Sequence, residues 1–195
     1  MGRAPLIGIL ALQGGVAEHA QHLRAAGAEV REVRTPAGLD GLDALVLPGG
    51  ESTTMTLGIA REGLAEPLRA FAASGRPLLA TCAGLILLDR EHLGLLPIRC
   101  ERNAFGRQIR SFESDLEVAG LEGGPIRAIF IRAPRVTERG DGVTVTAEVD
   151  GAVVGVRAGA IEGYAFHPEL TDDGRIHERF VAAVGAAAGP TAAAA

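Results

Sequence analysis

Strand-like runs alternate with helical patterns through the first half of the chain, and this alternation limits the fold more than any other feature. The run LIGILAL, residues 6–12, has the length and continuous apolar character of a buried strand. In the segment after it, Val16, Ala20 and Leu23 recur at helical spacing. Strands that alternate with helices pair in parallel through right-handed crossovers. We therefore expect an α/β domain with strands in 6–12, 29–33, 43–50 and 77–80, and further helices at 53–61 and 64–74.

The second half of the chain is richer in strands. A short run around PIRCER, residues 97–102, reads as a strand, and later strand patterns are separated by Gly and Asp turns. A last helix is predicted at 176–184, followed by the low-complexity, Ala-rich tail 186–195, which we expect to be disordered. A chain of 195 residues without a linker-like stretch is expected to form one domain, residues 1–185. The later strands are predicted at 126–132, 143–149, 152–158 and 161–166.

The charge and cysteine content narrow the class of protein. The formal net charge is −5, without a basic run, which argues against binding to nucleic acid or to a membrane surface. No apolar stretch approaches the length of a membrane span. Two cysteines without a secretory signal indicate free thiols in a reducing compartment. The expectation is a cytoplasmic enzyme or binding domain.

One cysteine lies in a turn that suits a nucleophile. Cys82 follows a strand pattern, is flanked by small residues in the stretch ATCAG, and precedes an apolar helix start. This is the strand–turn–helix context of a nucleophile elbow, with Cys in place of Ser. The helix N-terminus would lower the pKa of the thiol and offer backbone N–H groups to an oxyanion. The alternative is a buried structural cysteine. Ala80 stands where such turns usually have glycine, so the backbone must avoid a positive φ there.

A nucleophilic thiol needs a base, and His167 in the stretch FHPEL is the best candidate. Pro168 favours an extended backbone at His167, which places the side chains of His167 and Glu169 on the same side. Glu169 can then bind one ring nitrogen and leave the other to take the thiol proton. A histidine in a solvated turn is the alternative. Together, Cys82 and His167 favour a Cys–His–Glu triad.

Three other features carry weaker signals. His19 and His22, three residues apart, could both bind a metal ion, but a solvated helix face explains them better. Cys100 reads as a core or edge residue. The turn LPGGEST lets backbone N–H groups approach a ligand closely, although a plain strand-to-helix turn capped by Ser52 or Thr53 is equally possible.

Taken together, the motifs resemble those of class I, triad-type glutamine amidotransferases, and within this class the glutaminase subunits of pyridoxal 5′-phosphate synthases. The resemblance rests on LALQGGVAEH, LPGGESTTM, TCAGLILL, ERNAFGRQ, FIRAP and FHPEL, which are spread over residues 10–170. It implies a flavodoxin-like three-layer α/β sandwich with a mostly parallel central sheet. Two departures are Ala80 and the segment LLDREHLGLL, which is shorter than in many relatives.

The resemblance also implies a role for each matched residue. Cys82 would attack the side-chain amide of L-glutamine, with His167 as base and acid and Glu169 orienting it. Donors to the oxyanion would come from the glycine turn and the elbow, and Gln13 would lie where the synthase subunit docks. An Arg suits the α-carboxylate of the substrate. The implied substrate-binding residues are Gly50, Glu51, Ser52, Arg102, Ile131 and Arg132, and the implied oxyanion or activation residues are Gly49, Gly50, Ala83 and Gln13.

The implied function is the release of ammonia for a partner that builds pyridoxal 5′-phosphate from ribose 5-phosphate and glyceraldehyde 3-phosphate. That partner is a barrel subunit, so the chain is expected to work in a hetero-oligomer and to need neither a metal nor an organic cofactor. The alternatives are a glutaminase that serves another synthase, a non-catalytic docking subunit and a cysteine peptidase.

Overall fold

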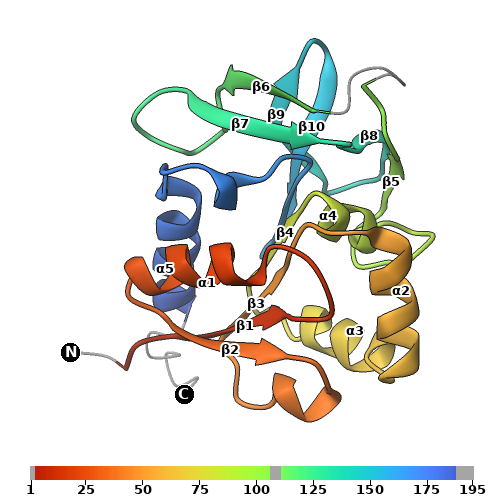
Figure 1. Cartoon of the computed structure of the whole chain (residues 1–195), viewed down its shortest axis with the longest axis vertical. Coiled ribbons are helices and arrows are strands. Elements are labelled where there is room, and N and C mark those ends of the chain that lie inside the picture. Colours follow the sequence, from red (N-terminus) through yellow and green to blue (C-terminus); the bar gives the residue numbers. More distant parts are fainter. Residues whose placement is uncertain (1–2, 106–110, 188–195) are drawn as a thin grey trace, which may run out of the picture.

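The computed structural model describes residues 3–105 and 111–187, and Figure 1 shows its α/β architecture. The segment ERNAFGRQ therefore lies partly outside the described residues. The strands are β1 Leu6–Leu10, β2 Glu29–Val33, β3 Ala44–Leu47, β4 Leu78–Thr81, β5 Ile98–Glu101, β6 Ser111–Leu116, β7 Ile126–Ile131, β8 Arg135–Arg139, β9 Thr144–Val149, β10 Ala152–Ala158 and β11 Ile161–Tyr164. The helices are α1 Val16–Ala25, α2 Ser52–Arg61, α3 Ala65–Ala73, α4 Ala83–Leu88 and α5 Arg175–Ala187, with short 3₁₀ turns η1 Pro36–Leu39 and η2 Pro168–Leu170.

The central sheet has the order β2-β1-β3-β4-β11-β10-β8-β5, with β9 paired to β10. The first five strands in this order run parallel, and those beyond β11 are antiparallel. The chain leaves β1 toward β2 and then returns to β3 on the other side of β1. Ligands of open α/β sheets bind at such a switch point, outside the carboxyl ends of the strands.

Helices cover both faces of this sheet. α1 packs against α5, and α2 against α4, and the two pairs lie on opposite sides of the parallel strands (Figure 1). β1, β3 and β4 are buried along nearly their whole length because both of their faces are covered. The α/β sandwich predicted from the sequence is therefore confirmed.

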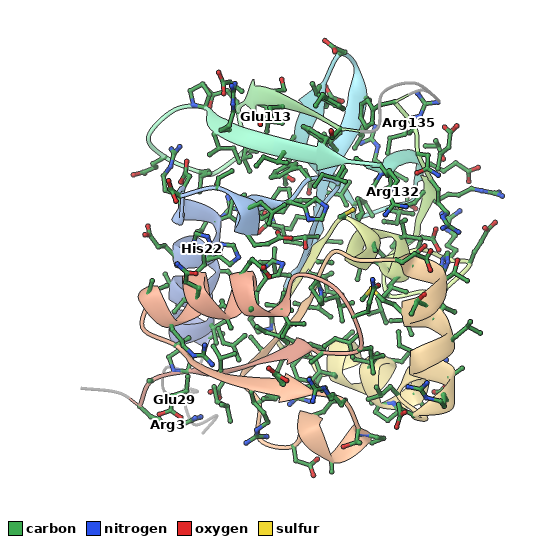
Figure 2. All side chains as sticks on the ribbon, viewed as in Figure 1. Arg3, His22, Glu29, Glu113, Arg132 and Arg135 are labelled. Carbon is green, nitrogen blue, oxygen red and sulfur yellow. The ribbon has the colours of Figure 1, made fainter. Side chains whose placement is uncertain are left out.

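The second half adds strands that the sequence analysis only partly predicted. β6 and β7 form a separate antiparallel ribbon, and β5 pairs with β8 at the sheet edge. β6 and β8 were not predicted, because their sequences SFESDL and RVTER are mostly polar. On these exposed strands the charges pair across the surface: Arg127 binds Glu113 and Asp115 on the ribbon, and Arg135 binds Glu101 at the edge (Figure 2 labels Glu113 and Arg135).

The last helix is longer than predicted. α5 begins one residue before the predicted helix and continues to Ala187, while residues 188–195 of the predicted tail lie outside the described residues. Over the described ranges, no helix is long and apolar enough to cross a membrane.

Candidate active site

Cys82 lies in a strained turn between β4 and α4. Its φ is 48° and its ψ −107°, a left-handed conformation that non-glycine residues rarely adopt. The turn is tightly packed. The Cys82 N–H donates to the Tyr164 carbonyl at 2.7 Å. A Cβ atom added to Gly84 would lie only 2.1 Å from the Leu47 carbonyl oxygen. Ala80 is an ordinary β4 residue and is not among the positive-φ residues, so alanine suffices there.

Backbone strain is concentrated around this turn. Among the described residues, four non-glycine residues have positive φ, and three of them, Cys82, Asn103 and Arg132, line one cavity. Arg132 follows the end of β7 (Figure 2). Strained residues of this kind gather at sites where geometry serves function.

His167 and Glu169 form a buried pair beside Cys82. The His167 N–H donates to the Ile129 carbonyl at 2.9 Å, which fixes the backbone after β11. Nδ1 of His167 donates to Oε1 of Glu169 at 2.7 Å, so Nε2 is left for the thiol. Glu169 is 4% exposed and lies against Gly15, where the positive end of α1 favours a carboxylate.

The electrostatics favour a charged imidazole. Burial works against this charge, but the hydrogen bonds and charges of Cys82 and Glu169 prevail and raise the pKa of His167 from 6.5 to about 10. Burial also opposes ionisation of Glu169, yet the hydrogen bond and the charge of His167 together outweigh it, and the pKa of the carboxyl group is lowered. The pair is therefore set to hold a proton taken from Cys82.

The glycine turn after β3 faces Cys82. The Gly49 N–H donates to Thr81 Oγ1 at 3.0 Å, so in this structure it is not directed at an oxyanion, in contrast to the prediction. Among the described residues, the N–H groups of Gly50 and Ala83 have no hydrogen-bond partner, and both residues line the cavity. These two N–H groups are therefore the available oxyanion donors.

A cavity of about 390 Å³ connects these groups, a volume suited to a small metabolite. All twelve residues predicted for the site line it: Gln13, Gly49, Gly50, Glu51, Ser52, Cys82, Ala83, Arg102, Ile131, Arg132, His167 and Glu169. The topology explains this convergence, because they follow the carboxyl ends of β1, β3, β4, β5, β7 and β11.

The rim of the cavity is polar and hydrogen bonded. Arg102 lies 3.2 Å from Glu51 Oε1 and 3.3 Å from the Thr53 hydroxyl. Glu51, rather than the predicted Ser52 or Thr53, caps α2, and the N–H groups of Thr53 and Thr54 donate to its carboxylate. These bonds, those from Thr54 foremost, lower the pKa of Glu51 to about 2. The Glu51 N–H donates to Gln13 Oε1 at 2.5 Å, which joins the β1 and β3 loops.

The prediction of a solvated helix face was wrong for His19. His19 is fully buried under the site, whereas His22 is partly exposed. The signal was present in the sequence, because His19 is three residues after Val16 and four before Leu23 and thus shares their apolar face. Asn103 and Glu18 also line the cavity and were not predicted. Within residues 3–105 and 111–187, no group of three His, Cys, Asp or Glu residues could hold a metal ion.

Comparison with known proteins gives consistent matches. The model of the SNO glutamine amidotransferase family matches residues 9–186. The pyridoxal 5′-phosphate synthase subunit PdxT of Geobacillus kaustophilus (strain HTA426) is 52% identical over 182 residues, which cover 90% of this chain and 92% of that protein. The protein of the same name from Acidothermus cellulolyticus is 50% identical over 198 residues, which cover 94% and 96%. A crystal structure described as a glutamine amidotransferase matches with a TM-score of 0.85 at 44% identity, covering 92% of this chain and 98% of that one.

Proposed function

This chain belongs to the SNO glutamine amidotransferase family, and from that membership we propose that it hydrolyses L-glutamine to L-glutamate and ammonia as the glutaminase subunit of a pyridoxal 5′-phosphate synthase. The observation that carries the proposal is the meeting of Cys82, on its strained turn, with the His167–Glu169 pair in one cavity. A non-catalytic docking subunit would be expected to lack one of these three side chains, and all three are present.

The first half-reaction forms a thioester. His167 takes the proton of Cys82, and the sulfur attacks the side-chain carbonyl carbon of glutamine. The N–H groups of Ala83 and Gly50 stabilise the oxyanion, with support from the positive end of α4. His167 then gives its proton to the amide nitrogen, the C–N bond breaks, and ammonia leaves.

The second half-reaction uses the same groups in reverse. His167 takes a proton from water, and the hydroxide attacks the glutamyl thioester. The C–S bond breaks, glutamate leaves, and the proton returns to Cys82. Glu169 holds the imidazole through both steps by its 2.7 Å bond to Nδ1.

The cavity wall supplies groups for the rest of the substrate. Arg102 is suited to the α-carboxylate, and its present partner Glu51 is suited to share the α-ammonium group. The Ser52 hydroxyl is buried at the cavity without a partner within the described part of the chain, so a ligand would satisfy it.

The ammonia is delivered to the barrel subunit of the synthase, which combines it with ribose 5-phosphate and glyceraldehyde 3-phosphate. The mouth of the cavity supports such a partner. Ile131 and Leu170 line it, and both are large apolar side chains more than a third exposed. Gln13 joins the β1 and β3 loops at the same mouth, so contact there can reach the oxyanion donors.

The test is ammonia release from glutamine by the chain with and without the barrel subunit, beside the Cys82→Ala variant. Release that needs Cys82 and rises with the barrel subunit supports the proposal. Release that needs Cys82 but does not change when the barrel subunit is added would indicate that the chain serves a different synthase. No release in either condition would favour the docking subunit, and release by Cys82→Ala would overturn the assigned nucleophile.

A further inference from the structure

A row of three histidines adjoins the active site, and His19 at its end lies next to Glu169 and Thr81. His19 in α1 is fully buried, and its Nδ1 lies 2.9 Å from Nε2 of His177 in α5. His22, which Figure 2 labels, stacks on His177 of α5 with ring centroids 4.7 Å apart. The reaction described above uses none of these three imidazoles.

The other ring nitrogen of His19 faces the active site. Its Nε2 lies 3.0 Å from Thr81 Oγ1 and 3.4 Å from Oε2 of Glu169. Oε2 is buried and has no hydrogen-bond partner among the described residues, while Oε1 is bound to His167. A buried carboxylate oxygen without a donor is costly, so the neighbouring ring nitrogen matters for Glu169.

The surroundings determine the protonation of this row. Burial lowers the pKa of His19, and it lowers the pKa of His177 to about 2, so both rings are neutral. The charged or titratable groups that act on His19 are Glu169, His167, His22 and Glu18. Of these, the Glu169 carboxylate lies against Nε2, and a carboxylate favours an N–H there over a lone pair.

With the proton of His19 on Nε2, the row is consistent throughout. His177 donates from Nε2 to Nδ1 of His19, and the unpaired atom is then the Nδ1 lone pair of His177, which is buried without a partner in the described part of the chain. The opposite tautomers would leave a buried N–H unpaired at that position, which is rarer in proteins. They would also set a lone pair of His19 against Glu169.

We propose that His19 is a positioning residue for glutamine hydrolysis: its Nε2–H, fixed by His177, supports Oε2 of Glu169 and thereby keeps Oε1 on Nδ1 of His167. The same Nε2 contacts Thr81, whose hydroxyl oxygen accepts the Gly49 N–H. One imidazole thus ties the third triad residue to the strand before Cys82 and to the glycine turn. The kinetic part of this inference rests on the proposed function.

The kinetic test compares His19→Phe, which removes the donor, with His19→Gln, whose amide N–H can replace it. His22→Gln is the matched control, because His22 lies in the same row and is not in contact with Glu169. In the complex with the barrel subunit, His19→Phe should lower kcat about tenfold or more with KM changed less than about twofold. His19→Gln should recover most of kcat, and His22→Gln should stay within about twofold of the original chain.

A double-mutant cycle separates positioning from general damage to the fold. In a Glu169→Ala background, His19→Phe should change kcat by less than about twofold, since the oxygen it supports is gone. An equal loss of kcat in both backgrounds, or the same loss in His19→Gln as in His19→Phe, overturns the proposal.

Two further measurements do not depend on turnover. Alkylation of Cys82 by iodoacetamide in the isolated chain should slow in His19→Phe and recover in His19→Gln, so the inference is decided even if the chain does not hydrolyse glutamine. Nitrogen NMR of the unmodified chain should place the His19 proton on Nε2, which covers the case in which His19→Phe fails to fold. A proton on Nδ1 overturns the proposal.

Discussion

A Cβ atom built on Gly49 would lie 2.4 Å from Cε1 of His167, so the glycine turn and the proposed base are in direct contact. The same atom would lie 3.2 Å from Cβ of Cys82. Gly49 thus fills the narrow space in which the proposed nucleophile and base meet.

Gly49→Ala should therefore displace His167 and lower kcat by about two orders of magnitude, because small misplacements of reacting groups cost that much. The chain should remain folded, as circular dichroism and thermal melting can show. Gly185→Ala is the control: no atom lies within 4 Å of its Cβ position, and a helical Gly→Ala change should stabilise α5 by roughly 0.5–1 kcal/mol. Unchanged activity in Gly49→Ala would contradict the contact.

The two free cysteines should differ in reactivity. Burial and the nearby Asp89 raise the pKa of the Cys100 thiol to about 12, while Cys82 faces a charged imidazole. At pH 8, iodoacetamide should label one thiol rapidly, and peptide mapping should identify it as Cys82. Cys100→Ala should keep both the labelling and the glutaminase activity, whereas rapid labelling in Cys82→Ala would sink the prediction.

The raised pKa of His167 makes stability depend on pH in a defined direction. An imidazole with a pKa of 6.5 when unfolded and about 10 when folded stabilises the fold fully below pH 6.5. This contribution declines as pH rises and is gone above about pH 10. The difference in free energy of unfolding between the chain and its His167→Gln variant should fall over that window, as measured by urea denaturation.

The Cys82 thiol contributes to the raised pKa of His167, and this contribution can be measured directly. Replacing the thiol in Cys82→Ser should lower the pKa of His167 toward its ordinary value, because Cys82 supplies both a hydrogen bond and a charge interaction. NMR titration of the imidazole Cε1–H reports this pKa in each chain. An identical titration in both would show that Glu169 alone holds the charge.

Arg102 should affect binding more than chemistry. Its guanidinium lies at the cavity rim, half exposed, and its hydrogen bonds go to Glu51 and Thr53 rather than to the Cys82 turn. Arg102→Ala should raise KM for glutamine by roughly ten- to a hundredfold, with kcat within about threefold, since a charged hydrogen bond contributes about 1.5–3 kcal/mol. Glu62→Ala, a change in the partly buried partner of Arg61 at the end of α2, serves as the control and should leave both constants unchanged.

The parallel half of the fold was predictable, because its physical signals are local. β3 was predicted together with its glycine turn because it is apolar and buried, and β2 was predicted with its observed ends. In the antiparallel part, β10 was also predicted with its observed ends. β6 was missed because a ribbon with one exposed face needs few apolar residues. His19 was misassigned for a different reason: its place on the apolar face of α1 could be read from the sequence, but its partner His177 comes from the other end of the chain.

The residues of the site were predicted from motifs and from the family resemblance, but the hydrogen bonds between them were not predicted. That the Gly49 N–H is taken by Thr81 follows only from the register in which β3, β4 and β11 pair. The turn around Cys82 was easy to recognise in the sequence, because a strained turn of this kind requires small flanking residues at fixed positions.

β4 and β11 are neighbours in the sheet although their sequences lie far apart, with Thr81 opposite Tyr164. Cys82 is synthesised well before its proposed base His167, which arrives only with the residues after β11. Because β11 must dock beside β4 before His167 can reach the sulfur, a chain still emerging from the ribosome carries an ordinary thiol. The reactivity of Cys82 is thus acquired late in synthesis, and fragments that end before residue 161 should not hydrolyse glutamine.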